Sequence, residues 1–228
     1  MQSIELLEKL RNKAVFGVQD IQRIADCSGP YAEQLLLRLK RRKLLRRVRR
    51  NAYTAKDSIH VIASNIVFPS YISFWSASSY LGYTEQIVNA VQVATMRSVR
   101  PLDFEGNRIQ FIRMGHFFGY RKLRTSEGEI FIADDEKLMI DAYLRPKACG
   151  NFDEIRKIYE NADMDEAKLA GYLKRIGSQT LIKQVGCLLE RTRGTDLSRR
   201  FTLDRNYAVL DPFSRRQEGT DPKWRILL

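Results

Sequence analysis

The sequence is poor in the residues and patterns that build most catalytic centres. Its 228 residues include only two histidines, His60 and His116, and three cysteines, Cys27, Cys149 and Cys187, which form no CxxC pair. This set argues against a zinc site and against a disulfide framework. The glycines form neither a GxGxxG motif nor a phosphate-binding loop, and no GxSxG motif marks a nucleophile. We therefore expect no cofactor, no metal and no catalytic residues.

Long apolar runs are also missing. No stretch approaches the roughly 18 apolar residues that a membrane-spanning helix needs. The first twelve residues, MQSIELLEKLRN, carry Glu5 and Glu8 where a signal peptide would be apolar. We expect a cytoplasmic protein without a membrane partner. Because 44% of the residues are hydrophobic, the chain can still bury the core of one large or two modest domains.

Acidic residues are absent from residues 38–50. This segment reads RLKRRKLLRRVRR and holds nine Arg or Lys in thirteen positions. Residues 1–56 contain fourteen Lys or Arg against five Asp or Glu, so they supply +9 of the net charge of +12. A charge that served only solubility would be spread more evenly. Its concentration indicates a surface that binds a polyanion, most readily double-stranded DNA.

The spacing of apolar residues predicts three helices and a hairpin around this basic segment. The helices are expected over residues 3–12, 19–25 and 31–42. The third has an apolar stripe at i, i+3, i+4 and i+7, formed by Ala32, Leu35, Leu36 and Leu39. Residues 44–48 and 52–54 read as two short strands joined by a turn at Arg50 and Asn51, since Asn tolerates the left-handed conformation. Three helices followed by a basic hairpin is the order of a winged helix-turn-helix, to which we assign residues 1–56.

The winged-helix interpretation gives each basic residue a role. The face of the third helix opposite the apolar stripe is expected to enter the major groove of DNA with Tyr31, Gln34, Arg38 and Arg41. The other cations are expected mainly to bind the phosphate backbone. They are Lys40, Arg42, Lys43, Arg46, Arg47, Arg49 and Arg50. Ser28 at the start of the helix and Asn51 in the turn complete the predicted DNA-binding set.

Residues 57–228 have a different, more balanced composition and read as a second, mixed α+β domain. A helix is expected over residues 73–81. Strands are expected at residues 89–96, 107–114 and 128–134, followed by a helix from Asp134 to just before Pro146 and by further helices to residue 193. The acids Asp134, Asp135 and Glu136 fit the first turn of a helix, where carboxylates cap free N–H groups. The alternative interpretation is that these three acids, together with Asp141, bind Mg²⁺.

Several segments, taken in order, resemble the AbiEi family of antitoxins. They are Pro69–Ser73, Trp75–Ala77, Leu81–Gly82, Val91–Thr95, Phe117–Gly119 and Ile132–Lys137, with Asp141 one turn further on. The resemblance covers roughly residues 5–145 and lies in their order and spacing rather than in any single motif.

The resemblance implies an N-terminal winged helix that binds inverted repeats in the operator of its own operon. Two copies on such repeats would form a homodimer on the DNA. It also implies that the larger C-terminal domain, residues 57–228, carries an antitoxin activity. That activity would counter a nucleotidyltransferase-like toxin, usually without a stable complex. The family's antitoxin residues form no compact motif that can be placed on this sequence.

The sequence therefore predicts a DNA-binding autorepressor, the antitoxin of a toxin–antitoxin operon, and not an enzyme. Two alternatives remain open. One is a general nucleic-acid-binding module that prefers RNA. The other is a metal-dependent nuclease or transferase that uses the acids between Asp134 and Asp141.

Overall fold

The computed structural model describes residues 3–228 and is a mixed α+β protein. The chain divides into two compact units, each assembled from three separate stretches of sequence. Among the described residues, the first unit comprises 3–72, 89–113 and 122–132, and the second comprises 73–88, 114–121 and 133–228. The domain boundary predicted between residues 56 and 57 falls inside the first unit and stays a prediction. No helix within residues 3–228 is long and apolar enough to cross a membrane.

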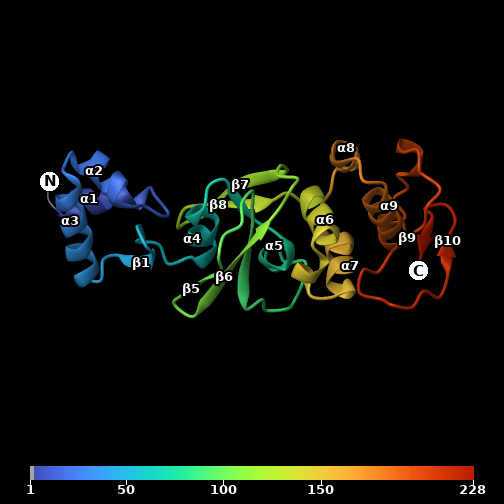
Figure 1. Cartoon of the computed structure of the whole chain (residues 1–228), viewed down its shortest axis with the longest axis horizontal. Coiled ribbons are helices and arrows are strands. Elements are labelled where there is room, and N and C mark those ends of the chain that lie inside the picture. Colours follow the sequence, from blue (N-terminus) through green and yellow to red (C-terminus); the bar gives the residue numbers. More distant parts are fainter. Residues whose placement is uncertain (1–2) are drawn as a thin grey trace. The chain divides into compact units, whose positions relative to one another are not determined.

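The first unit begins with three helices and a hairpin, the elements that the apolar spacing predicts (Figure 1). They are α1 (Ser3–Arg11), α2 (Val18–Ala25), α3 (Gly29–Arg41), β1 (Arg46–Arg49) and β2 (Ala52–Thr54). β1 and β2 pair antiparallel, with an irregularity between Arg47 and Arg49. Asn51 has φ 56°, the left-handed turn conformation that was predicted. Between α1 and α2, Phe16 forms an isolated antiparallel bridge with Tyr53 of β2.

The predicted apolar stripe of α3 is confirmed as the centre of this segment's core. Its four members, Ala32, Leu35, Leu36 and Leu39, are all buried. They pack with buried side chains of α1, α2 and the flanking loops, namely Leu6, Leu10, Phe16, Ile21 and Leu45. Because one side of α3 is anchored in this way, its other side is held in a fixed orientation toward solvent.

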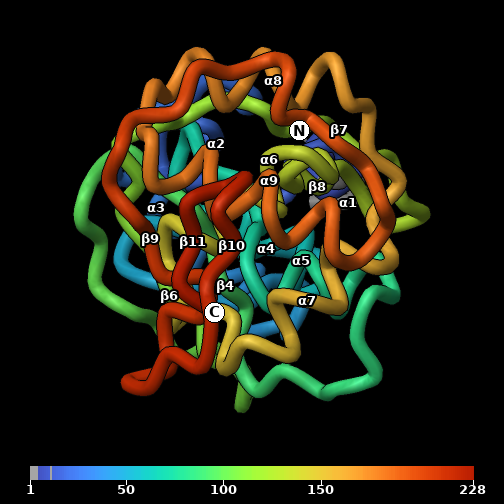
Figure 2. The backbone as a smooth tube through the Cα atoms, turned by 90° about the vertical axis from the view of Figure 1, so that its right-hand side faces the viewer, coloured from blue at the N-terminus to red at the C-terminus, as the bar shows by residue number. Residues whose placement is uncertain are grey.

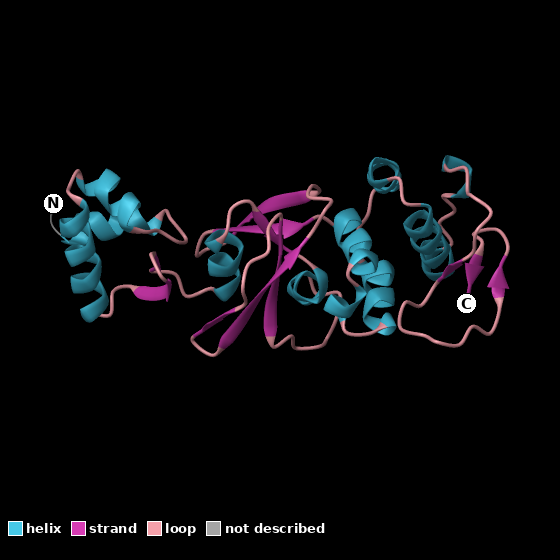
Figure 3. Ribbon diagram, viewed as in Figure 1, coloured by secondary structure: helices cyan, strands magenta, loops and turns pink. Residues whose placement is uncertain are grey.

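The first unit also carries α4 (Ile59–Ile66) and a mixed six-stranded sheet. The strands are β3 (Ser70–Ile72), β4 (Ala90–Thr95), β5 (Leu102–Phe104), β6 (Asn107–Arg113), β7 (Tyr120–Arg124) and β8 (Glu129–Ala133). Their order is β5-β6-β4-β3-β8-β7, with β4 parallel to β6 and antiparallel to β3. α4 packs against β3 and β4 (Figure 3). The three predicted strands are confirmed as β4, β6 and β8, whereas α4, β3, β5 and β7 were not predicted.

The second unit is mainly helical. Its helices are α5 (Phe74–Tyr80), α6 (Asp135–Leu144), α7 (Phe152–Asn161), α8 (Glu166–Ile176) and α9 (Gln179–Arg193), with short 3₁₀ turns at Pro146–Cys149 and Ser198–Arg200. α6 packs against α5, α7, α8 and α9, and all its residues from Asp135 to Tyr143 are buried. Three two-residue strands, β9 (Ala208–Val209), β10 (Thr220–Asp221) and β11 (Ile226–Leu227), lie side by side in the order β10-β11-β9 (Figure 2).

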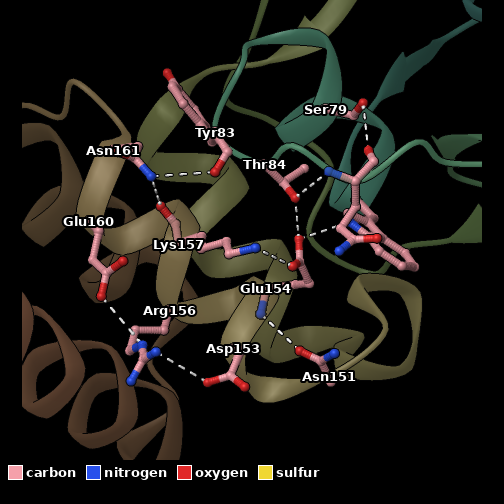
Figure 4. A network of polar contacts seen from close by, with 12 residues as sticks. Ser79, Tyr83, Thr84, Asn151, Asp153, Glu154, Arg156, Lys157, Glu160 and Asn161 are labelled. Atoms are coloured by element: carbon pink, nitrogen blue, oxygen red, sulfur yellow. Dashed lines mark hydrogen bonds and ion pairs between the residues drawn. The ribbon is translucent and has the colours of Figure 1, made fainter.

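Glu154 at the start of α7 holds several segments of the second unit together (Figure 4). Its Oε2 atom accepts hydrogen bonds from Trp75 Nε1 at 3.0 Å and from Thr84 Oγ1 at 2.5 Å, and its Oε1 atom lies 2.8 Å from Lys157 Nζ. Partial burial alone would raise the pKa of Glu154. The bonds from Lys157 and Thr84 outweigh that effect and leave the pKa below its usual value.

Candidate nucleic-acid interface

The predicted binding residues divide into two groups by their contacts. All of them except Arg46 are exposed, and among the described residues no side-chain hydrogen bond or ion pair joins ten of them to another part of the first unit. These ten are Ser28, Tyr31, Gln34, Arg38, Lys40, Arg41, Arg42, Lys43, Arg47 and Arg50. The other three, Arg46, Arg49 and Asn51, are bonded to other parts of the first unit.

Seven of these ten residues are cations, and they carry a large uncompensated charge. Throughout the described chain, none of these seven forms an ion pair, so no carboxylate of residues 3–228 neutralises them. They are Arg38, Lys40, Arg41, Arg42, Lys43, Arg47 and Arg50. Like charges held this close repel one another, and the repulsion falls when phosphates or other anions bind among them. The arrangement is suited to a polyanion.

Arg46 was assigned to the phosphate grip, and in the structure its guanidinium is paired with two acids of the same unit. Its guanidinium lies 2.7 Å from a carboxylate oxygen of Asp57 and 2.9 Å from one of Glu105, and it donates to the carbonyl of Lys56. The guanidinium carbon also lies 5.9 Å from the centre of the Phe104 ring. Two acids already compensate this charge, so Arg46 fastens the hairpin to the rest of the unit.

Arg49 and Asn51 also make structural contacts. An Arg49 Nη2 atom donates to the carbonyl oxygen of Ile66, at the end of α4, at 3.0 Å. Asn51 Oδ1 accepts a hydrogen bond from the backbone N–H of Val18, the first residue of α2, at 2.9 Å. Asn51 therefore satisfies one of the free N–H groups that every helix has at its start.

Arg47 and Arg50 line a groove between the hairpin and the helices. The groove has a volume of about 570 Å³, and α2 and α3 form its other walls. Its lining residues are Val18, Gln19, Gln22, Glu33, Leu36, Leu37, Arg47, Arg50, Asn51 and Tyr53. It thus combines two guanidinium groups, three amides, one carboxylate and an apolar patch.

Seven of the groove's lining residues lie outside the predicted DNA-binding set: Val18, Gln19, Gln22, Glu33, Leu36, Leu37 and Tyr53. Gln19 and Gln22 lie one turn apart on α2, opposite the buried Ile21. Leu37 was detectable, because it is a leucine outside the apolar stripe of α3, and it is 49% exposed. No pattern in the sequence indicates that the hairpin closes a groove over this side of α3, because that depends on the contact between Asn51 and Val18.

The acids of α6 were the alternative candidate, and the structure places each among basic or hydroxyl groups. Asp134 caps α6 by accepting from the N–H of Lys137 at 3.0 Å, which confirms the capping interpretation. Its other oxygen accepts from the Tyr172 hydroxyl at 2.9 Å and lies 3.0 Å from Lys168 Nζ. Burial, followed by the hydrogen bond to Asp134, raises the pKa of Tyr172 to about 12.

The remaining acids of α6 have the same kind of surroundings. Asp135 lies 2.8 Å from Arg121, and Glu136 lies 2.6 Å from Lys168. Asp141 is fully buried, forms an ion pair with Lys137 on the same helix, and accepts from the Ser73 hydroxyl at 2.8 Å. Within the part of the chain that the structure describes, no three His, Cys, Asp or Glu side chains come together as a metal ion would require.

No model of a known protein family matches the chain. A search of curated proteins likewise finds no match.

Proposed function

We propose that the protein is a DNA-binding transcriptional regulator that holds duplex DNA with α3 and the β1–β2 hairpin. The observation that carries the proposal is the row of seven exposed cations on these elements, which no acid of the described chain neutralises. Arg38 and Arg41 would enter the major groove with Tyr31 and Gln34, while Arg47 and Arg50 would contact phosphates.

The arrangement of the N-terminal elements supports a winged helix-turn-helix. The chain runs from α1 through the bridging Phe16 to α2, α3 and the hairpin. The bridge between Phe16 and Tyr53 adds a third, minimal strand beside the hairpin. In such a module the second of two closely connected helices lies in the major groove, and the hairpin flanks it as a wing.

The resemblance to AbiEi-family antitoxins refines the proposal. The protein would be a cytoplasmic autorepressor that binds inverted repeats in its own operator as two copies, one α3 in each half-site. Residues 57–228 would carry an antitoxin activity that counters a nucleotidyltransferase-like toxin without a stable complex. Every acid of the alternative metal site has a basic or hydroxyl partner, which favours a structural role for these acids and therefore the regulator over the enzyme.

DNA binding can be tested with the full chain and a duplex from upstream of its own gene. If about six phosphates are neutralised, the logarithm of the binding constant should fall against the logarithm of the salt concentration with a slope near −5. Arg38→Ala and Arg41→Ala should each weaken binding by about tenfold or more. Arg199→Ala, an exposed arginine of the second unit, is the matched control and should leave affinity unchanged. A slope near zero would refute the proposal.

Competition with a structured RNA separates the regulator from the RNA-binding alternative. A preference for operator duplex below about 10³-fold would favour RNA. The antitoxin activity needs its own test, in which the protein is co-expressed with a nucleotidyltransferase-type toxin encoded beside its gene. Growth rescue supports that activity, and continued toxicity with intact DNA binding removes the antitoxin role alone.

A further inference from the structure

The groove between α3 and the hairpin differs chemically from the rest of the cationic surface. Beyond the groove, the exposed side of α3 ends in Arg38, Lys40 and Arg41, which attract any nucleic acid in the same way. Inside the groove, amides, a carboxylate and a leucine stand opposite Arg47 and Arg50. A protein surface that combines hydrogen-bond donors, acceptors and apolar groups can distinguish one base edge from another.

Glu33 is the unexpected member of this set. It is the only acidic residue of α3, it is exposed, and it lies in a wall of the groove. Within residues 3–228 it takes part in no ion pair, so its charge is not absorbed by the neighbouring arginines. Leu37 follows it one helical turn later on the same side of α3.

A carboxylate in this position opposes simple attraction to DNA. Two like charges about 4 Å apart repel each other even in water, so Glu33 repels a nearby phosphate. A hydrogen bond from a donor group on a base to the carboxylate offsets this repulsion. In the major groove the N4 amino group of cytosine is such a donor, and acidic side chains pair with it.

We propose that Glu33 determines sequence specificity by accepting a hydrogen bond from the amino group of a cytosine in the major groove. Arg47 and Arg50, on the opposite wall, hold the phosphates that flank this base. The inference rests on the proposed function, because it assigns a base to a site that first has to bind duplex DNA. It adds a position at which the protein rejects wrong sequences through repulsion.

The test compares the wild-type chain with Glu33→Gln on a library of duplexes with a randomised centre, read by sequencing. Glu8→Gln, an exposed acid of α1 outside the groove, is the matched control, since it changes the net charge equally. The wild-type protein should prefer cytosine at one position by about tenfold or more. Glu33→Gln should lose that preference and bind random duplex more tightly. Glu8→Gln should keep the preference.

The outcomes separate this inference from the proposed function. If the wild-type protein selects no duplex sequence, both fail. If it selects a sequence and Glu33→Gln selects the same one with equal strength, DNA binding stands and the role of Glu33 is refuted. Because Glu33 is exposed, the variant should unfold at the wild-type temperature, and a melting curve checks this.

Discussion

Asn51 at the tip of the hairpin lies directly against the first turn of α2. Its Oδ1 atom accepts from the N–H of Val18 at 2.9 Å. The preceding Gly17 allows this approach, because a Cβ atom at position 17 would lie 2.7 Å from the carbonyl oxygen of Asn51. The position of the hairpin, and with it the width of the groove, depends on the absence of one methyl group.

Gly17→Ala should therefore displace the hairpin. We expect the free energy of unfolding to fall by about 1–3 kcal/mol, the usual cost of forcing an extra carbon into a packed contact. Affinity for duplex DNA should fall as well, because Arg47 and Arg50 move with the hairpin. Urea denaturation and a binding titration measure the two effects. Gly29→Ala is a control, since its Cβ would meet the side chain of Gln22 only at 3.6 Å. Equal effects of the two substitutions would contradict the expected tight contact at Gly17.

Arg46 and Arg50 lie in the same basic run but should behave oppositely when replaced. Arg46→Ala removes ion pairs to Asp57 and Glu105 and should cost about 1 kcal/mol of stability. Its effect on DNA affinity should be small. Arg50→Ala should leave the melting temperature unchanged and weaken binding to all duplexes alike. If the two substitutions weakened binding equally, the division of the basic run into an anchored and a free part would be wrong.

Glu154 should make the second unit sensitive to acid. The pKa of its carboxyl is lower in the folded chain than the usual 4.5. Between the folded and the unfolded pKa, the unfolded chain therefore binds more protons than the folded chain. The stabilisation is present above about pH 4.5 and is lost as the pH falls through the lower, folded value. Denaturation curves taken between neutral and acidic pH should show this loss. In Glu154→Gln the dependence should be shallower, and an unchanged pH dependence would show that other carboxylates dominate.

Gly186 on α9 should tolerate no side chain. A Cβ atom there would lie 2.2 Å from Cζ3 of Trp224, whose ring is fully buried and whose Nε1 donates to Glu190 at 2.6 Å. Gly186→Ala should destabilise the protein by about 1–3 kcal/mol or more, with a change in tryptophan fluorescence as Trp224 is displaced. Gly171→Ala on α8 is the matched control, because nothing lies within 4 Å of its Cβ position. It should stabilise its helix by up to about 1 kcal/mol.

Elements that carry a regular apolar spacing or a local capping residue were predictable from the sequence. The α3 stripe and the first turn of α6 are examples, since Leu36 recurs with helical spacing and Asp134 caps through local geometry alone. α4 was missed because it is short and mainly apolar, and a short apolar run does not by itself distinguish a helix from a strand. β5 and β7 are short strands at the two ends of the sheet, and apart from Phe104 their residues are exposed or half-buried.

The candidate interface was predictable in charge but not in shape. A run of arginines indicates that a polyanion can bind. It does not indicate which of the arginines form ion pairs with acids elsewhere in the fold. Arg46 finds Glu105, which is 59 residues away in sequence. Glu33 was not predicted as a binding residue. A single acid in a basic segment becomes a candidate only when the structure shows that it lines the groove.

The chain passes back and forth between its two units, so neither unit is encoded as a continuous stretch of gene. A recombination event that transferred residues 3–132 would carry pieces of the second unit with the first, and a break after residue 72 would leave the sheet without most of its strands. No single cut in the chain separates the two units from each other. The helices and hairpin of residues 3–54 do form a contiguous stretch, but even this stretch is tied to the rest of its unit through Arg46 and Arg49.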